Sequence, residues 1–102
     1  MLFRSPQIES EGKIVGKIIH IDRFGNLVTN FTKENLPDEF VVEVNNVKIG
    51  KMRKYFAEAE KGELFVIFGS ANFLEIVAFQ ESAAKKINAE TGGKIIVTNS
   101  LI

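Results

Sequence analysis

The chain has 102 residues, 45% of them hydrophobic and nine of them Phe, which is enough apolar surface for one compact core and one domain. Thirteen basic and thirteen acidic residues cancel, so no net field gathers nucleic acid or anionic lipid. The absence of Cys excludes disulfides and thiolate sites, and no apolar run approaches the roughly 20 residues of a membrane span. We therefore expect a cytoplasmic protein that does not enter the membrane and does not have nucleic acid as its main partner.

The N-terminal third predicts two strands after an irregular start. Residues 1–12 show no hydrophobic period, so we expect a leader or the remnant of a linker there, with the folded domain over 13–102. Two apolar runs, 13–22 and 27–31, lie on either side of a break at Gly25. Such runs, rich in Ile and Val and interrupted by Gly, indicate two strands joined by a turn.

The middle of the sequence predicts a helical turn and a hairpin. Thr32 is a suitable N-cap for a turn over 32–37. Alternating valines flank Asn45 and Asn46 within 40–50. Asn tolerates the left-handed conformation of tight turns, so this pair predicts a β-hairpin, and residues 51–56 are expected to extend the sheet.

The C-terminal part predicts three more strands and one short helix. The strands are expected over 64–68, 73–79 and 94–98, and Ser82 is the expected N-cap of a helix that ends before the glycine pair 92–93. Six or seven short strands with one short helix favour an all-β fold, a small antiparallel β-barrel that is closed or nearly closed. A β-sandwich is the alternative.

Most enzyme classes lack their usual residues here. There is no Walker loop, no dinucleotide-binding glycine pattern and no zinc-ligand spacing. His20, the single His, lies in an apolar run and is expected on a partly hydrated strand face. The carboxylate pairs Glu34 with Asp38 and Glu58 with Glu60 flank turns, so we expect them to be solvated and to lack the apolar pocket that an acid or base catalyst needs. No catalytic residue and no metal site is predicted.

The segment 22–26 is the strongest candidate for a functional site. Asp22, Phe24, Gly25 and Asn26 place a carboxylate, an aromatic ring, a freely turning residue and an amide where a strand ends. An amide can match the donor and acceptor edge of adenine, and an aromatic ring can stack on a base. Asp and Gly are also common turn formers, so spacing alone favours a simple turn.

Two other segments are candidates. In 68–73, small residues between two strands let backbone amides approach a carboxylate or ribose, although a hairpin loop has the same composition. In 54–57, Tyr55 and Phe56 point to opposite faces if extended, which leaves one ring for the core and one for stacking.

Three segments in order, GKIIHIDRFGNLVTNF at 16–31, YFAEAEKGELFVIFGSANFLEIV at 55–77 and ESAAKKI at 81–87, resemble the C-terminal domain of the S-adenosylmethionine hydroxide adenosyltransferase family. Fluorinases and chlorinases are relatives of that family. The resemblance implies a β-barrel that forms one wall of a site for S-adenosylmethionine (SAM) or adenosine. The enzyme would split SAM with water into adenosine and methionine, with SAM as the substrate and no cofactor.

The resemblance also implies a set of substrate-binding residues, which are Asp22, Phe24, Asn26, Phe56, Ser70, Ala78 and Gln80. Asp22 would hold the methionine amino group, and Ser70 would bind the methionine carboxylate. Phe24 would line the pocket, Asn26 would read the adenine edge and Phe56 would stack on the base. The backbone around Ala78 to Gln80 would face the adenine.

The sequence departs from the family pattern at two positions. Halogenating members have Arg where this chain has Ala71, so the hydrolytic branch is the better match. An Asn is usual where this chain has Phe79, so the adenine contact of that strand lacks its usual residue.

The family's larger N-terminal domain, which carries the Asp, Arg and His that position and activate water, has no counterpart in these 102 residues. We therefore expect no catalysis by this chain alone. In relatives the site forms between the C-terminal domain of one subunit and the N-terminal domain of the next within a trimer. The expected partners are thus such a catalytic domain and further copies of the chain.

Two alternatives from other classes stay open. A small non-catalytic barrel can bind single-stranded nucleic acid through exposed Phe and Lys side chains, although the neutral net charge weighs against this function. A structural domain that binds a protein partner is the other alternative.

Overall fold

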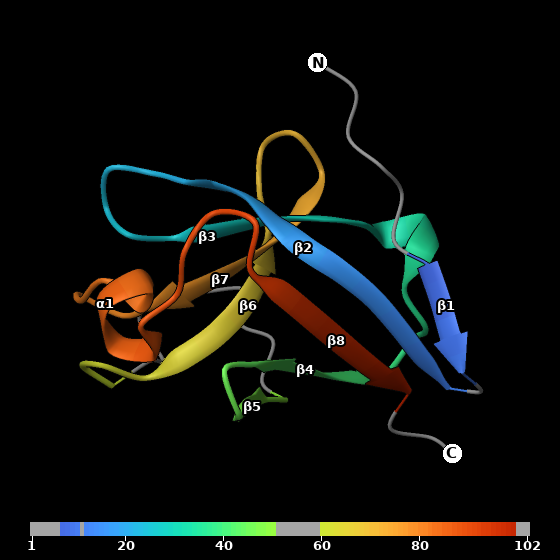
Figure 1. The fold of residues 1–102 in the computed structure, drawn as a ribbon. Coiled ribbons are helices and arrows are strands. Elements are labelled where there is room, and N and C mark those ends of the chain that lie inside the picture. The colour runs from blue at the N-terminus through green and yellow to red at the C-terminus, as the bar shows by residue number, and fades with distance from the viewer. Residues whose placement is uncertain (1–6, 11, 51–59, 100–102) are drawn as a thin grey trace.

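The structure, a computed structural model, describes residues 7–10, 12–50 and 60–99 (Figure 1). These residues form eight strands, one 3-10 turn and one short α-helix, so the predicted mainly β class is confirmed. No helix among them is long and apolar enough to cross a membrane. In chain order the elements are β1 (Gln7–Ser10), β2 (Lys13–Ile21), β3 (Leu27–Thr32), η1 (Lys33–Asn35), β4 (Phe40–Val44), β5 (Val47–Ile49), β6 (Leu64–Phe68), β7 (Phe73–Ala78), α1 (Ala83–Ile87) and β8 (Lys94–Asn99).

Seven of the strands form a nearly closed barrel. They are hydrogen-bonded in the order β5-β4-β8-β2-β3-β7-β6, every pair is antiparallel, and the end strands β5 and β6 contact each other. The predicted antiparallel barrel is confirmed. β1 pairs with β2 outside this path, so the sheet includes residues of the 1–12 segment. The strand extension expected over 51–56 lies outside the described residues.

The core fills the barrel because side chains alternate between its inside and outside. Ile18, Phe31, Leu74 and Ile95 come from four different strands, and each is almost fully buried in one cluster. Ile87 of α1 belongs to the same cluster, so the helix covers one end of the barrel. Figure 1 shows the β2–β3 loop at that same end.

The local signals in the sequence form the predicted turns and caps. Asn45 and Asn46 have φ angles of 49° and 66°, the left-handed conformation that a tight hairpin requires. Thr32 caps η1, and its backbone N–H and hydroxyl both donate to the side-chain oxygen of Asn35 at 2.9 Å. Ser82 caps α1 by accepting the backbone N–H of Lys85 at 3.2 Å. These predictions are confirmed.

Candidate functional site

The carboxylate of Asp22 organises the loop between β2 and β3. Its Oδ1 accepts the backbone N–H groups of Phe24 and Asn26 at 2.9 and 3.0 Å, and its Oδ2 accepts the side-chain Nδ2 of Asn26 at 3.1 Å. The backbone of the loop is also closed, because the N–H of Asp22 donates to the carbonyl of Asn26 at 3.1 Å. Oδ2 accepts one hydrogen bond here and has a lone pair left for a second. The turn that the spacing favours is therefore present, and it holds the Asn26 side chain in one orientation.

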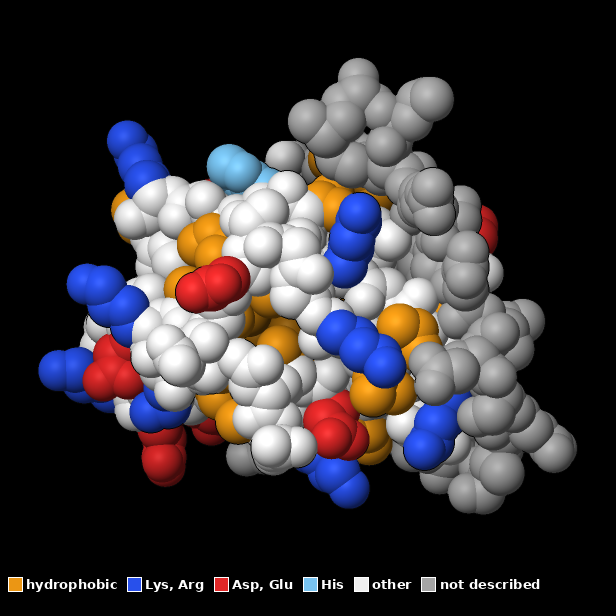
Figure 2. Space-filling view, viewed as in Figure 1, with side chains coloured by type: hydrophobic (Ala, Val, Ile, Leu, Met, Phe, Trp, Pro, Cys, Tyr) orange, Lys and Arg blue, Asp and Glu red, His pale blue; other side chains and the backbone are white. Residues whose placement is uncertain are grey.

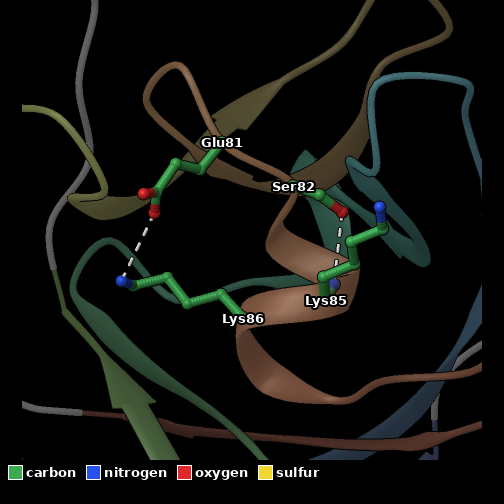
Figure 3. A network of polar contacts seen from close by, with 4 residues as sticks. All are labelled: Glu81, Ser82, Lys85 and Lys86. Carbon is green, nitrogen blue, oxygen red and sulfur yellow. Dashed lines mark hydrogen bonds and ion pairs between the residues drawn. The ribbon is translucent and has the colours of Figure 1, made fainter.

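Gly25 allows this loop to pack directly on the start of α1. Its φ is +84°, and a Cβ at this position would collide with the side chain of Ser82. The carbonyl of Gly25 accepts the N–H of Ala84 at 2.9 Å. Figure 3 shows the hydroxyl of Ser82 turned to the first turn of α1, where it caps the N–H of Lys85. The loop and the helix are thus held in a fixed relation.

An open hollow of about 520 Å³ lies where this loop meets the end of β7. Phe24 and Asn26 line one side of the hollow and residues 77–82 line the other. Leu27 pairs with Ile76, so the chain before β3 and the chain after β7 come together at this point.

Two side chains of the loop are available to a ligand in the hollow. Phe24 is 63% exposed and is the one large hydrophobic side chain that is exposed among the described residues. The guanidinium of Arg23 lies 4.9 Å from the centre of the Phe24 ring, a distance at which a cation–π contact steadies the ring. Asn26 uses one N–H for Asp22, and no other described residue engages its second N–H or its Oδ1, so these two groups can bind a partner with complementary groups.

The far wall of the hollow is a tight turn. The N–H of Glu81 donates to the carbonyl of Ala78 at 3.2 Å, and Gln80 between them has a φ of +58°. The backbone of Phe79 is already paired, because its N–H donates to the carbonyl of Glu63 at 3.0 Å. Of the backbone expected to face adenine, the exposed Gln80 is therefore the most accessible part. At the rim, the carboxylate of Glu81 lies 3.5 Å from the Lys86 ammonium (Figure 3), a surface contact of small energy.

The fold brings most of the predicted site residues to this hollow. Phe24, Asn26, Ala78 and Gln80 all line it, although the loop and the far wall are distant in sequence. Asp22 lies behind Asn26 and holds it. Their roles toward a ligand stay predictions, but the geometry places four of the seven residues around one space.

The other predicted residues lie elsewhere. Ser70 is exposed in the loop between β6 and β7, at the start of β7, whereas the hollow lies at the end of β7. Phe56 is outside the described residues. His20 is exposed on β2, directly opposite Val28 of β3, as expected of a residue on a hydrated strand face.

Glu75 of β7 is a residue near the site that the sequence did not single out. It is directly opposite Val28 and Ile67 on the neighbouring strands, and a Cβ at Gly69 would collide with its carboxylate. Burial and, to a lesser extent, the negative charge of Asp22 raise the pKa of Glu75 above its ordinary value of 4.5. A carboxylate in the otherwise apolar run 73–78 was the available signal.

Comparison with known protein families identifies the family of this chain. Residues 16–96 match the sequence model of the family described as the SAM hydroxide adenosyltransferase C-terminal domain. The chain belongs to this family. The predicted resemblance is thereby confirmed, and the match covers every residue that lines the hollow.

Individual relatives support the same relation. The (R)-S-adenosyl-L-methionine hydrolase of Methanocaldococcus jannaschii is 31% identical to this chain over 85 residues, which cover 72% of this chain and 32% of that protein. Crystal structures of an uncharacterized conserved protein from Thermotoga maritima and of a conserved hypothetical protein from Thermus thermophilus have the same fold, with TM-scores of 0.77 and 0.68. The Thermotoga protein is 29% identical, and the match covers 97% of this chain and 40% of that one. The Thermus protein is 26% identical, and the match covers 81% of this chain and 34% of that one. The chain thus spans about a third of the length of the curated relative.

Proposed function

We propose that this chain is the SAM- and adenosine-binding domain of a cytoplasmic SAM hydrolase, which converts SAM and water to adenosine and L-methionine. The observation that supports it most is the hollow itself. In a chain that belongs to this family, an exposed aromatic ring and an amide with a free donor and acceptor line one open space of about 520 Å³. That volume is in the range of small-molecule sites in proteins.

The adenine end of the ligand is assigned to this hollow. A base stacks on the exposed ring of Phe24, which is in contact with the Arg23 guanidinium. Asn26 offers its second N–H and its Oδ1 to the base edge, in the orientation that Asp22 imposes. Phe56 is proposed to stack on the second face of the base, and Ser70 to bind the methionine carboxylate.

The chemical step is assigned to another domain. Of the polar groups that line the hollow, the hydroxyl of Ser82 caps α1 and the carboxylate of Glu81 is near Lys86. Among the described residues, neither group has a partner that would make it a nucleophile or a general base. The relatives are considerably longer than this chain, and their additional length provides room for a catalytic domain. We propose that such an N-terminal domain, in a trimer, covers the hollow and supplies the residues that activate water.

Titration calorimetry with adenosine and SAM tests this function. We expect weak but measurable binding by the native chain. Asn26→Ala should lower the affinity about tenfold, because it removes a hydrogen-bonding pair. Phe24→Ala and Phe56→Ala should each lower it by a similar or larger factor through lost stacking. Lys48→Ala, an exposed change on β5, is the control and should leave the affinity unchanged. If the native chain does not bind either compound, even when the N-terminal domain of a relative is supplied, the proposal is wrong.

One observation favours the nucleic-acid alternative. Lys13, Lys17 and Lys94 are exposed on the paired strands β2 and β8, and Lys17 is directly opposite Lys94. Figure 2 shows basic side chains over this part of the surface. A group of exposed basic side chains on one face is the kind of surface that a bound polyanion would contact. Filter binding with single-stranded oligonucleotides at low and high salt tests whether the chain binds nucleic acid. A true electrostatic contact with the phosphates weakens steeply as the salt concentration rises.

A further inference from the structure

The outer surface of the barrel has a row of four side chains that crosses four strands. His20 of β2 is opposite Val28 of β3, Val28 is opposite Glu75 of β7, and Glu75 is opposite Ile67 of β6. Residues that are directly opposite in a sheet share a face. The neighbours of Glu75 along β7, Leu74 and Ile76, point into the core, so the side chain of Glu75 lies on the outside.

Glu75 lies midway between the two parts of the proposed site. β7 begins after the loop that contains Ser70 and ends at the hollow, which starts at Val77. The carboxylate of Glu75 packs over Gly69 at the foot of that loop, since a Cβ there would collide with it. A ligand whose base is in the hollow and whose other end reaches Ser70 must pass Glu75.

The charge of Glu75 is not balanced within the described part of the chain. No hydrogen bond or ion pair from described residues reaches its carboxylate, and both burial and the negative charge of Asp22 raise its pKa. A partly buried carboxylate without a cation nearby lowers the stability of the fold. A bound cation would offset this cost.

We propose that Glu75 faces the sulfonium centre of SAM and makes the site prefer this cationic ligand over neutral adenosyl compounds. This inference rests on the proposed function. In SAM the sulfur joins the adenosyl group to the amino-acid chain, so it lies in the middle of the ligand, as Glu75 lies in the middle of the site. A carboxylate attracts a cation and gives no such attraction to a thioether. Because the site is open to water, we expect a preference of roughly three- to tenfold.

The test compares SAM with S-adenosylhomocysteine, which has a neutral thioether in place of the methylated sulfonium. The 102-residue chain is titrated with SAM, S-adenosylhomocysteine and adenosine by NMR of its backbone amides, which measures weak affinities. The native chain should bind SAM roughly three- to tenfold more tightly than the thioether. Glu75→Gln should abolish this preference and leave the affinities for the thioether and adenosine unchanged. Glu75→Asp should restore part of the preference.

The matched control is Glu43→Gln on β4, a carboxylate directly opposite Lys48 and away from the hollow, which should retain the preference. If adenosine binds but Glu75→Gln weakens SAM and the thioether equally, the inference is overturned and the proposed function stands. If adenosine does not bind the native chain, the proposed function fails, and the inference fails with it. Thermal melting of each variant, followed by circular dichroism, shows that it is folded during the titration.

Discussion

Replacement of Gly25 by Ala probes how tightly the β2–β3 loop is held against α1. An Ala at a φ of +84° costs about 1–2 kcal/mol in backbone strain. Its Cβ would also collide with Ser82, and forcing an extra group into such a contact costs about 1–3 kcal/mol. We therefore expect Gly25→Ala to lower the free energy of unfolding by about 2–5 kcal/mol, a large part of the stability of a small domain.

Gly92→Ala is the matched control for this prediction. Gly92 has nearly the same φ, +88°, but no atom lies within 4 Å of the position of its Cβ. This variant should show the backbone cost alone, so the difference between the two variants measures the contact with Ser82. Urea unfolding followed by far-UV circular dichroism suits a chain without Trp.

The double variant Gly25→Ala/Ser82→Gly should recover the part of the loss that comes from the collision with the Ser82 side chain, whereas the close approach of the added Cβ to the Ser82 Cα at 2.9 Å remains. A Gly N-cap in place of Ser costs only a few tenths of a kcal/mol, so the recovery is measurable. Equal destabilisation by Gly25→Ala and Gly92→Ala would refute the tight contact. It would also refute the view that the loop and the helix are positioned together.

Two further predictions concern stability. The Nδ2 of Asn45 donates to the carbonyls of Ile87 and Asn88 at 3.1 and 2.9 Å, which joins the β4–β5 hairpin to the end of α1. Asn45→Gly keeps the left-handed turn and should lower the free energy of unfolding by about 1–2 kcal/mol in urea. The neighbouring change Asn46→Gly should cost less, and a cost as large would contradict the role of this contact. Glu75 has a pKa raised by folding, so its contribution is most favourable below pH 4.5 and is lost as the pH rises through the folded-state pKa. Glu75→Gln should therefore raise the melting temperature at about pH 7 relative to the native chain. The difference in melting temperature between the two proteins should disappear below pH 4.5. If it is the same at both pH values, the raised pKa of Glu75 is not its cause.

Much of the local structure was predictable because its causes lie within a few residues. Asn45 and Asn46 favour a left-handed turn through their own backbones, and Ser82 caps a helix that begins at the next residue. The apolar runs rich in Ile and Val, interrupted by glycines, predicted where most of the strands lie. The loop 22–26 was also recognisable, since a carboxylate, a glycine and an amide so close together can close a turn by themselves.

Local sequence patterns could not predict which residues come together in the site. Asn26 lies beside Val77 because β3 pairs with β7, and Gly25 lies against Ser82 because α1 folds back to cover the barrel end. These neighbours are far apart in the chain, and no local pattern specifies which strands pair. The order that places β8 between β4 and β2 is a property of barrel closure.

Glu75 shows most clearly which properties follow from the sequence and which follow only from the tertiary structure. The alternation of residues in β7 already places its side chain outside the core, because Leu74 and Ile76 point inward. Only the packed sheet decides that its carboxylate lies over Gly69, within reach of the charge of Asp22 and without a cation from the described residues. The sequence by itself indicated most of the strands and the turns, since those depend on short-range sterics and hydrogen bonds, and its ordered motifs indicated the family, but it did not indicate β1. The tertiary structure decided which of these residues share one hollow, because that depends on contacts between distant segments.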